Sequence, residues 1–350
     1  MRDESAPVRA GEELNIEALS SYLGSDVTVE QFSKGHSNLT YLLKAGVREY
    51  VLRRGPLGPV APKAHDMARE YRVLEAVHPH FPEAPRVFQL CEDASIIGAV
   101  FFLMERRHGL VLRETVPAEV AAVKDYPLRI SKAFVGCLAR LHAIDVARTG
   151  LSALGKPDGF LERQVMGWAD RWQRAKTDEI GLMDDVIRWL SERRPESGKP
   201  TLVHNDFKLD NVMLPLDGVD RIEAVLDWEM TTVGDPLADV GLTLCYWCWG
   251  DEPTVTSQAG WYTREQFVGR YAELTGRDVA GIGYYEVLGI FKLAVILQQI
   301  YFRFRRGQTA DKRFENFGER VRGLVGAAAR LIGESDTIGS PWSDWKPSSK

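Results

Sequence analysis

The residues with the clearest potential for chemistry form two short polar segments in the second half of the chain. The first, His204-Asn205-Asp206-Phe207-Lys208-Leu209-Asp210-Asn211, lies between two short apolar runs, which predicts a tight loop that exposes several polar side chains. Asp227 follows sixteen residues after Asn211, at the end of the apolar run 222–226. Phosphoryl transfer requires a carboxylate that orients the attacking hydroxyl and oxygen ligands that hold Mg²⁺. The two segments therefore favour phosphoryl transfer to an alcohol.

The order and spacing of these residues carry a resemblance. H-x-D-x-x-x-x-N followed by an Asp at a strand end resembles the catalytic and metal loops of the protein-kinase-like fold. The version found here, with Leu226-Asp-Trp-Glu229 and then Gly234-Asp-Pro236, resembles the aminoglycoside phosphotransferase and choline kinase family. The segment 138–145, Leu-Ala-Arg-Leu-His-Ala-Ile-Asp, is similar to the helix that precedes the catalytic loop in that family. The resemblance spans residues 25–330 and implies a two-lobed α+β fold, with a small β-rich N-terminal lobe and a larger, mostly helical C-terminal lobe.

The resemblance also implies roles for individual residues. Asp206 matches the catalytic base or hydroxyl-orienting acid, and Asn211 and Asp227 match the two Mg²⁺ ligands. Lys208 matches a lysine near the transferred phosphate, where its charge stabilises the transition state. His204 is expected to pack the loop rather than to act as an acid or base.

Three nearby acids have less specific expectations. Glu229 is left open between assistance in metal or substrate binding and a structural role. Asp235 and Asp239 are expected to cap and brace the helix that follows them.

The small lobe is expected to bind the nucleotide. In Tyr50-Val-Leu-Arg-Arg54, strand alternation puts Val51 and Arg53 on one face, so that Val51 contacts the base while Arg53 reaches the phosphates. The family usually has Lys at this position, and Arg53 departs from that pattern while it preserves the charge. Glu70, on a helix predicted over residues 66–77, is the expected partner of Arg53.

Two further segments complete the predicted nucleotide site. The stretch 33–40 has a single glycine and resembles the Gly-x-Ser-Asn turn of the family, in which Gly35, Ser37 and Asn38 are expected to bind phosphate oxygens. Backbone groups of Met104, Glu105 and Arg106 are candidates to bind the purine edge. They do not discriminate between ATP and GTP.

The elements that must position these residues follow from periodicity. Strands are predicted over 27–32, 39–45, 49–53, 86–90 and 96–105, forming a five-stranded sheet that carries one helix. Beyond residues 106–109 helices dominate, including a long apolar helix over 287–303, with three short strand-like pieces at 201–203, 211–214 and 222–226. We predict a nucleotide-binding lobe over residues 1–105, a catalytic and substrate lobe over 106–335, and a mobile tail over 336–350.

Composition excludes several classes of protein. The chain has 49 acidic and 44 basic residues, so its net charge is −5. This negative charge argues against a nucleic-acid partner. The run Ile96 to Met104 is about half the length of a bilayer-spanning helix, so no membrane segment is expected. Four cysteines and a charged N-terminus without an apolar signal segment predict a reducing, cytoplasmic setting. The sequence gives no oligomeric state.

Some features have a chemical and a plain interpretation. Cys245 and Cys248 are expected to be two core thiols; a thiol redox protein is the alternative, and no second ligand pair completes a zinc site. The aromatic residues are expected in the core, with the acceptor pocket as the alternative; they are Tyr246, Trp247, Trp249, Trp261 and Tyr262. For Arg303, Arg305 and Arg306, a solvated helix end is favoured over contact with an anionic substrate.

Together these observations predict a kinase that transfers the γ-phosphoryl group of ATP or GTP to a hydroxyl of a small metabolite, with Mg²⁺. The short spacing between the two motif segments disfavours protein substrates. Leu52-Arg-Arg54 and the segment 291–303 look most like the kinase domain that some animal proteins fuse to an acyl-CoA dehydrogenase. That resemblance suggests a hydroxyacyl-CoA or hydroxy acid as acceptor, with aminoglycoside or choline-type substrates as alternatives. A nucleotide-binding pseudokinase scaffold is the alternative of another class.

Overall fold

The structure is a computed structural model that describes residues 5–32, 38–57, 66–248, 254–309 and 311–338. Side chains are described for these residues except 248 and 334–338. The chain forms two compact units, the first made of residues 1–137 and 209–231 and the second of residues 138–208 and 232–350. The lobe boundaries predicted at residues 105 and 335 stay predictions.

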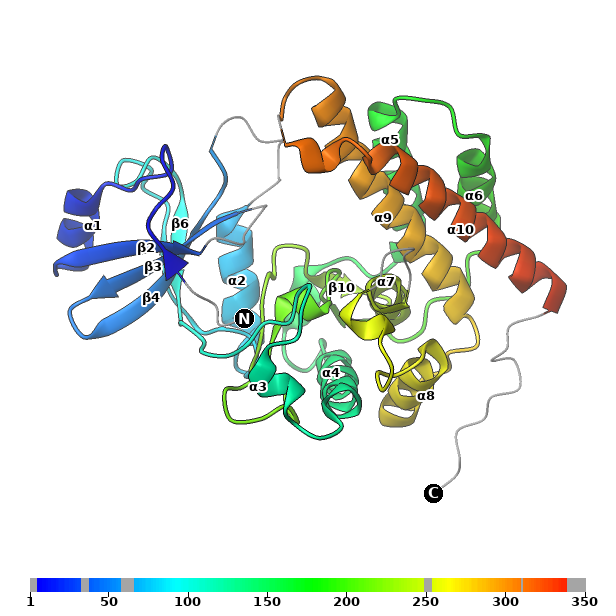
Figure 1. Cartoon of the computed structure of the whole chain (residues 1–350), viewed down its shortest axis with the longest axis horizontal. Coiled ribbons are helices and arrows are strands. Elements are labelled where there is room, and N and C mark those ends of the chain that lie inside the picture. Colours follow the sequence, from blue (N-terminus) through cyan, green and yellow to red (C-terminus); the bar gives the residue numbers. More distant parts are fainter. Residues whose placement is uncertain (1–4, 33–37, 58–65, 249–253, 310, 339–350) are drawn as a thin grey trace. The chain divides into compact units, whose positions relative to one another are not determined.

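The first unit is built on an antiparallel sheet with the strand order β1-β2-β3-β4-β6-β5 (Figure 1). Its strands are β1 (Ser5–Ala6), β2 (Val27–Phe32), β3 (Leu39–Ala45), β4 (Arg48–Arg54), β5 (Val87–Cys91) and β6 (Phe101–Met104). Five of them were predicted, but β6 is shorter than the predicted strand 96–105. The sixth, β1, contains two residues that pair with Phe32 and Gln31 of β2, and a strand so short has no alternation to recognise.

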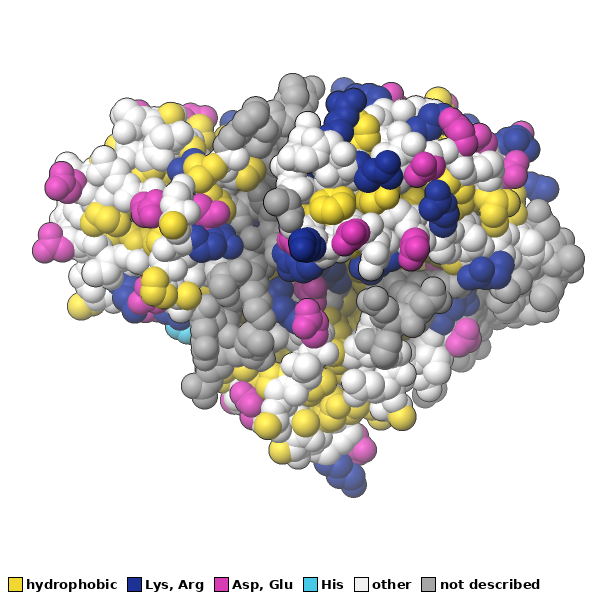
Figure 2. Space-filling model, turned by 45° about the horizontal axis from the view of Figure 1, so that its top comes forward, with side chains coloured by type: hydrophobic (Ala, Val, Ile, Leu, Met, Phe, Trp, Pro, Cys, Tyr) yellow, Lys and Arg dark blue, Asp and Glu magenta, His cyan; other side chains and the backbone are white. Residues whose placement is uncertain are grey.

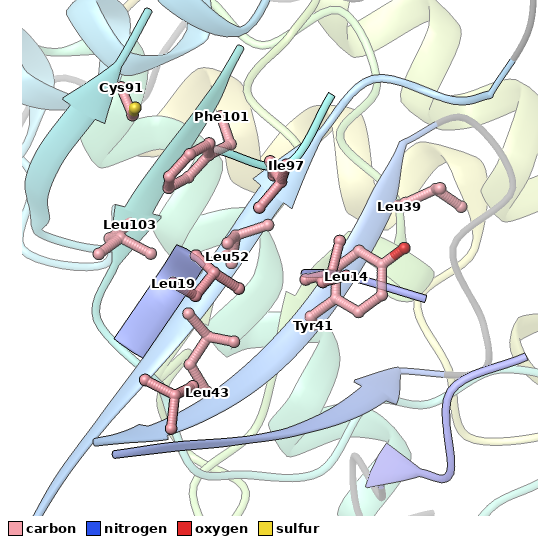
Figure 3. Close-up of a cluster of buried hydrophobic side chains, with 11 residues drawn as sticks. Leu14, Leu19, Leu39, Tyr41, Leu43, Leu52, Cys91, Ile97, Phe101 and Leu103 are labelled. Atoms are coloured by element: carbon pink, nitrogen blue, oxygen red, sulfur yellow. The ribbon is translucent and has the colours of Figure 1, made fainter. Parts of the chain in front are cut away.

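One face of this sheet is covered by helix α1 (Ile16–Leu23), which was not predicted. Because successive strand residues point to opposite faces, alternate positions of β3, β4 and β6 meet α1 and its flanking loops. Figure 3 shows the resulting core. It consists of Leu14, Leu19, Val27, Leu39, Tyr41, Leu43, Leu52, Cys91, Ile97, Phe101 and Leu103.

The intervening positions of the strands face helix α2 (Met67–Val77). Tyr71 of α2 packs edge-on against Phe102 of β6, with ring centroids 6.2 Å apart. Asp66 precedes helix α2 and caps it, since its carboxylate accepts a hydrogen bond from the Arg69 amide. This places Glu70 in the first turn of α2, on the same side of the sheet as Arg53.

A short hairpin in the same unit follows residues 204–211, the predicted catalytic segment. Strands β8 (Val212–Met213) and β9 (Ala224–Val225) pair antiparallel, and Leu214 forms a backbone bridge with Leu110. Gly109 makes this approach possible, since a Cβ atom there would lie 2.2 Å from the Leu214 carbonyl oxygen. The segment after β6 is thereby joined to the hairpin. Helix α3 (Ala118–Ala121) lies farther along, before α4 (Tyr126–His142), which continues into the second unit.

The second unit is mostly helical. Its helices are α5 (Phe160–Ala175), α6 (Gly181–Glu192), α7 (Pro236–Cys248), α8 (Arg264–Thr275), α9 (Ile282–Arg305) and α10 (Phe317–Ile338), and β7 (Thr201–Val203) pairs with β10 (Thr232–Gly234). Helix α9 contacts α5, α6, α7 and α10 (Figure 1). A Cβ atom at Gly241 of α7 would lie 2.3 Å from the Tyr285 carbonyl oxygen, so glycine permits the close packing of α7 on α9.

Helix α9 changes one expectation from the sequence. No membrane-spanning stretch was predicted, yet α9 is long and apolar enough to cross a bilayer by length and composition alone. Half of its apolar window is buried inside the structure, and it carries the buried polar residues Glu286, Lys292 and Gln298. These features are typical of a core helix in a folded domain.

The end of the chain also differs in part from the prediction. Helix α10 continues to Ile338, so the first residues of the predicted tail are helical. Residues 339–350 lie outside the described residues.

Both signs of charge are present on the surface that Figure 2 presents. On this face Lys and Arg side chains are interspersed with Asp, Glu and hydrophobic side chains. The distribution fits the small net charge of −5.

Candidate functional site

In the first unit, Arg53 of β4 lies at the centre of a charged cluster. Its Nη2 atom lies 3.2 Å from Glu70 Oε1 and donates a hydrogen bond to Asp227 Oδ1 at 3.0 Å. The pairing of Arg53 with Glu70 is the one expected from the sequence. The contact with Asp227 was not expected, and it links the strand to the acidic segment that follows β9.

The cluster is almost buried, and this governs its protonation. Burial opposes the charge of Arg53, but Glu70 and Asp227 outweigh it and raise the pKa of the guanidinium further above its usual value. Burial raises the pKa of Glu70 to about 7; Arg53 opposes this shift, while Asp227 and Glu229 add to it. One guanidinium therefore stands near three carboxylates, and the cluster has an excess of negative charge.

Two atoms in the cluster have no hydrogen-bond partner among the described residues. They are Arg53 Nε and Glu70 Oε2, both buried. An unpaired buried polar atom costs free energy, which favours a polar ligand at this position.

The predicted metal ligands lie in the same unit. The Leu226 amide donates to the Asn211 carbonyl oxygen at 2.8 Å, which holds the residue before Asp227 against the last residue of the segment 204–211. Asp227 has a φ of +65°, in the left-handed region that few residues other than glycine adopt. A carboxylate and a side-chain amide oxygen are the hard ligands that suit Mg²⁺, so this pair fits the ion.

A pocket in the first unit brings most of the predicted nucleotide-site residues together. Its lining combines apolar side chains with the charged cluster: Phe32, Thr40, Val51, Arg53, Glu70, Leu74, Pro85, Met104, Glu105, Arg106, Arg107, Arg113, Asp210, Asn211, Met213, Leu226, Asp227 and Trp228. The Glu105 amide already donates to the Arg86 carbonyl at 2.8 Å, which weakens its candidacy for the purine edge. Arg106 donates to Glu49 at 2.8 Å.

The phosphate-binding turn is described only in part, because Gly35 and Ser37 lie outside the described residues. Asn38 is buried, and its Nδ2 atom donates to Glu229 Oε2 at 2.9 Å. Arg69 of α2 donates to the Glu229 carbonyl oxygen at 2.7 Å. Glu229, whose role was left open, therefore connects the turn and α2 to the acidic segment.

In the second unit, α7 holds the catalytic segment by its backbone. Asp239, in the first turn of α7, accepts hydrogen bonds from the amides of His204 at 2.6 Å and Asn205 at 2.8 Å. Thr243 of α7 donates to the Phe207 carbonyl at 2.8 Å. Asp239 was expected to brace the helix, and it braces the catalytic segment instead.

A buried network around Asp239 completes this support. Burial lowers the pKa of His142, so its ring is neutral near pH 7. Burial would raise the pKa of Asp239, but the hydrogen bonds from His142 and from the His204 amide help to hold it below its usual value. His142 Nε2 therefore donates to Asp239, 3.2 Å away, and Nδ1 accepts from the Tyr271 hydroxyl at 2.8 Å.

The two predicted catalytic side chains lie together and remain accessible. Lys208 Nζ is 2.9 Å from Asp206 Oδ2, and the side chains of Lys208 and Asp206 are 26 % and 20 % exposed. Lys208 also lies over the Tyr246 ring, 4.9 Å from its centroid. His204 is fully buried, its ring packs edge-on against Phe207, and its Nδ1 accepts from the Asp206 amide at 3.3 Å.

A family model matches most of the chain. The model of the phosphotransferase enzyme family, abbreviated APH, matches residues 28–274. The chain belongs to this phosphotransferase family. As a member it is a small-molecule phosphotransferase that acts on a hydroxyl acceptor.

Curated relatives of this phosphotransferase are longer proteins. Acyl-CoA dehydrogenase family member 10 of Mus musculus is 32 % identical over 337 residues, which cover 91 % of the chain and 31 % of the relative. Family member 11 of Rattus norvegicus is 32 % identical over 358 residues, covering 95 % of the chain and 45 % of the relative. The chain thus spans less than half the length of these relatives.

Solved structures share the fold of this phosphotransferase. A candidate aminoglycoside phosphotransferase from Ralstonia eutropha has a TM-score of 0.79 and 28 % identity, over 92 % of this chain and 99 % of that one. An aminoglycoside phosphotransferase in complex with AMP-PNP and hygromycin B has a TM-score of 0.61 and 20 % identity, covering 90 % and 97 % of the two chains. Choline kinase from Cryptosporidium parvum has a TM-score of 0.62 and 13 % identity, covering 90 % and 92 %. They confirm the predicted protein-kinase-like α+β fold.

For several residues that had two interpretations from the sequence, the structure shows the surroundings of the side chain. Cys245 is buried in α7, where its Sγ donates to the Gly241 carbonyl; the Cys248 side chain and Trp249 lie outside the description. Trp247 and Trp261 pack edge-on in the core, with centroids 5.6 Å apart. Tyr246 is the member of the aromatic set that, among its described residues, lies against Lys208.

Several residues near the site were missed from the sequence. Arg69 is adjacent to the expected Glu70, but its hydrogen bond to the Glu229 carbonyl oxygen joins positions far apart in the sequence. Such a contact leaves no local pattern. Lys292 was passed over as part of a long apolar helix. Its signal was available, since a single lysine in an otherwise apolar run is unusual.

Proposed function

We propose that this phosphotransferase transfers the γ-phosphoryl group of ATP to a hydroxyl of a small hydroxy acid or hydroxyacyl thioester, with Mg²⁺ held by Asn211 and Asp227. The cluster of Arg53, Glu70 and Asp227 beside an apolar pocket carries this proposal. It offers a cation for phosphates, a carboxylate for a metal and an apolar surface for a base within one unit.

The nucleotide side of the proposal rests on the lining of that pocket. Val51 and Met104, paired across β4 and β6, offer apolar contact to a purine, and Arg53 lies two residues after Val51. The unpartnered Arg53 Nε supports a phosphate oxygen as ligand. We choose ATP over GTP because a structural neighbour binds AMP-PNP.

The metal side rests on the chemistry of the donor set. Asn211 and Asp227 supply two oxygen ligands, and phosphate oxygens and water would supply the others. When bound, Mg²⁺ neutralises charge on the phosphate oxygens during transfer. Asp227 must then exchange its contact with Arg53, at least in part, for the metal.

The acceptor side rests on Asp206 and Lys208. Asp206 orients the hydroxyl of the acceptor and receives its proton, and Lys208 stabilises charge on the transferred group. Both side chains are partly exposed, as a group that meets a substrate must be. In a loose transition state the attacking hydroxyl needs little help from a base to lose its proton. The main contribution of Asp206 is therefore to position that hydroxyl.

The acceptor class rests on the relatives. Their names are those of acyl-CoA dehydrogenases, and their matched portion covers nearly the whole chain. Tyr246 beside Lys208 provides an aromatic surface that suits an acyl chain, and the positive charge of Lys208 disfavours a polycation at the same place. An aminoglycoside is the second candidate, because a neighbour of similar fold binds hygromycin B.

Steady-state assays with three acceptor sets test the proposal: hydroxy acids and hydroxyacyl-CoA thioesters, aminoglycosides of the kanamycin type, and choline. We expect turnover with the first set. Efficient phosphorylation of an aminoglycoside without turnover of hydroxyacyl compounds would overturn the acceptor and leave the kinase assignment. No transfer to any alcohol, with nucleotide bound, would favour the pseudokinase.

A further inference from the structure

A buried lysine in the second unit has no role in the reaction proposed above. Lys292 lies in the middle of α9 and is 3 % exposed. Its Nζ atom donates a hydrogen bond to Asn205 Oδ1 at 3.3 Å and lies 5.7 Å from the centroid of the Trp168 ring. Among the described residues, no carboxylate lies within 4.0 Å of this ammonium group.

A lysine at such a position is costly for the fold. Burial lowers the pKa of Lys292 to about 8, while the charges of Asp239 and Asp206 partly oppose the shift. Methionine would fill the same space in α9 without a charge to desolvate. A buried charge without an ion-pair partner, close to a catalytic residue, is more typical of a functional site than of a packing role.

Within the described part of the chain, the one hydrogen bond of Lys292 reaches Asn205, the residue directly before Asp206. Asn205 has a φ of +65°, so its backbone is held in the left-handed region. Asp239 fixes this backbone by accepting from the Asn205 amide. Lys292 holds the other end of the residue, the side-chain amide, from a different helix. Contacts from α7 and α9 thus fix the backbone and the side chain of Asn205, and through them the orientation of the next residue, Asp206.

We propose that Lys292 is a positioning residue that acts through the Asn205 side chain to orient Asp206 toward the acceptor hydroxyl. The inference rests on the proposed role of Asp206. It explains why an otherwise apolar stretch of α9 carries an ammonium group at the position that contacts Asn205. It also predicts that removal of the charge changes turnover rather than nucleotide binding.

The charge of Lys292 also gives the proposal a pH signature. Four groups from the surrounding elements face it: Asp239 and Cys245 of α7, Asp206 of the catalytic segment, and Arg171 of α5, which opposes the lysine charge. As the pH rises through about 8, Lys292 loses its proton and the hold on Asn205 weakens. Turnover of the parent protein should therefore fall on the alkaline side near this pH.

Lys292→Met and Gln298→Met form a matched pair for the test. Gln298 lies on the same helix and is equally buried, and its Nε2 donates to the Ala175 carbonyl at 2.8 Å, away from the catalytic segment. Melting temperatures of both variants are measured with kcat and KM for nucleotide and acceptor. We expect Lys292→Met to lose about 10²-fold in kcat, with the KM for nucleotide nearly unchanged, because a small misplacement of a catalytic group has effects of that size. Gln298→Met should retain the parent kcat.

Asn205→Gly supplies a second, independent measurement. Glycine tolerates the left-handed backbone but lacks the amide that Lys292 holds. We expect a loss of kcat similar to that of Lys292→Met, little further loss in the double variant, and no alkaline decline near pH 8 in either. Equal kcat values for Lys292→Met and Gln298→Met, or a parent-like kcat for Asn205→Gly, would overturn the proposal.

Asp206→Asn, measured in parallel, separates this inference from the proposed function. If Asp206→Asn keeps the turnover of the parent, the proposed role of Asp206 fails and the inference fails with it. If Asp206→Asn loses turnover while Lys292→Met does not, only the inference fails.

Discussion

At the scale of single residues, the charge balance around Arg53 gives a testable pH dependence. Glu70 has an ordinary pKa of 4.5 in the unfolded chain and a pKa of about 7 in the folded protein. The folded state therefore holds this proton more tightly than the unfolded state does. The contribution of Glu70 to stability is fully present below pH 4.5 and is lost as the pH rises through about 7.

Glu70→Gln should remove this dependence. We expect the free energy of unfolding of the nucleotide-free parent to decline between pH 4.5 and 7 relative to Glu70→Gln, whose neutral amide does not titrate there. Urea titrations at a series of pH values measure both proteins. Parallel profiles for the two would show that Glu70 is already ionised at low pH in the folded protein.

Arg53 permits a second comparison at this scale. Arg53→Lys keeps the positive charge beside Glu70 but loses the planar, forked guanidinium group. Arg53→Ala leaves the buried Glu70 carboxylate without its cation. We expect nucleotide affinity and kcat to fall more in Arg53→Ala than in Arg53→Lys. Nucleotide binding and turnover in Arg53→Ala that equal those of the parent would assign the phosphate contact to another residue.

At the scale of elements, α7 holds the catalytic segment through Asp239. Asp239→Asn replaces a buried carboxylate oxygen that accepts a backbone amide by a group that donates. We expect a loss of about 3 kcal/mol in stability, since a buried donor is left unpaired, and a fall in turnover as the segment loosens. Thermal melting and steady-state kinetics measure the two effects.

The matched control is Asp220→Asn, which removes the carboxylate that pairs with Arg129 on the surface. An exposed pair contributes little, so this variant should melt and turn over like the parent. If Asp239→Asn also behaves like the parent, α7 does not support the catalytic segment in the way described here.

Elements of the fold differ in how far the sequence reveals them. Strands β2 and β3 have the predicted bounds because their apolar residues alternate between two flanking turns. Helix α1 was missed although Asn15 caps it, because its eight residues give only about two turns of periodicity. The predicted strand 96–105 was too long, since Ile97 belongs to the core from a loop before β6 rather than from the strand itself.

The candidate site likewise contains residues that a local pattern reveals and contacts that it does not. Asp206, Lys208, Asn211 and Asp227 were named from motif spacing, which is local. The bonds from Asn38 and Arg69 to Glu229 join positions far apart in the sequence, where no local pattern records them. The hydrogen bond from Lys292 to Asn205 is also long-range, although the lysine itself stands out locally in an apolar run.

At the scale of the whole molecule, nucleotide binding should stabilise the fold as a unit. A ligand that binds only the folded state at one hundred times its Kd adds about 2.7 kcal/mol to the stability. We expect Mg²⁺ with ATP to raise the melting temperature of the parent, and Asp227→Ala to lose most of the part that depends on Mg²⁺. An equal rise in both proteins would remove Asp227 from the metal site.

The membership of the phosphotransferase family and the geometry of the two units lead to one central claim, that Asp206 positions an acceptor hydroxyl for transfer from Mg²⁺-bound ATP. The most direct measurement is the rate of phosphoryl transfer from ATP to a hydroxy acid or hydroxyacyl thioester, compared between the parent and Asp206→Asn under saturating nucleotide. The claim predicts a phosphorylated acceptor with the parent, and a turnover lower by roughly 10²–10⁴-fold with Asp206→Asn, which still binds nucleotide. Turnover in Asp206→Asn close to that of the parent would contradict the claim.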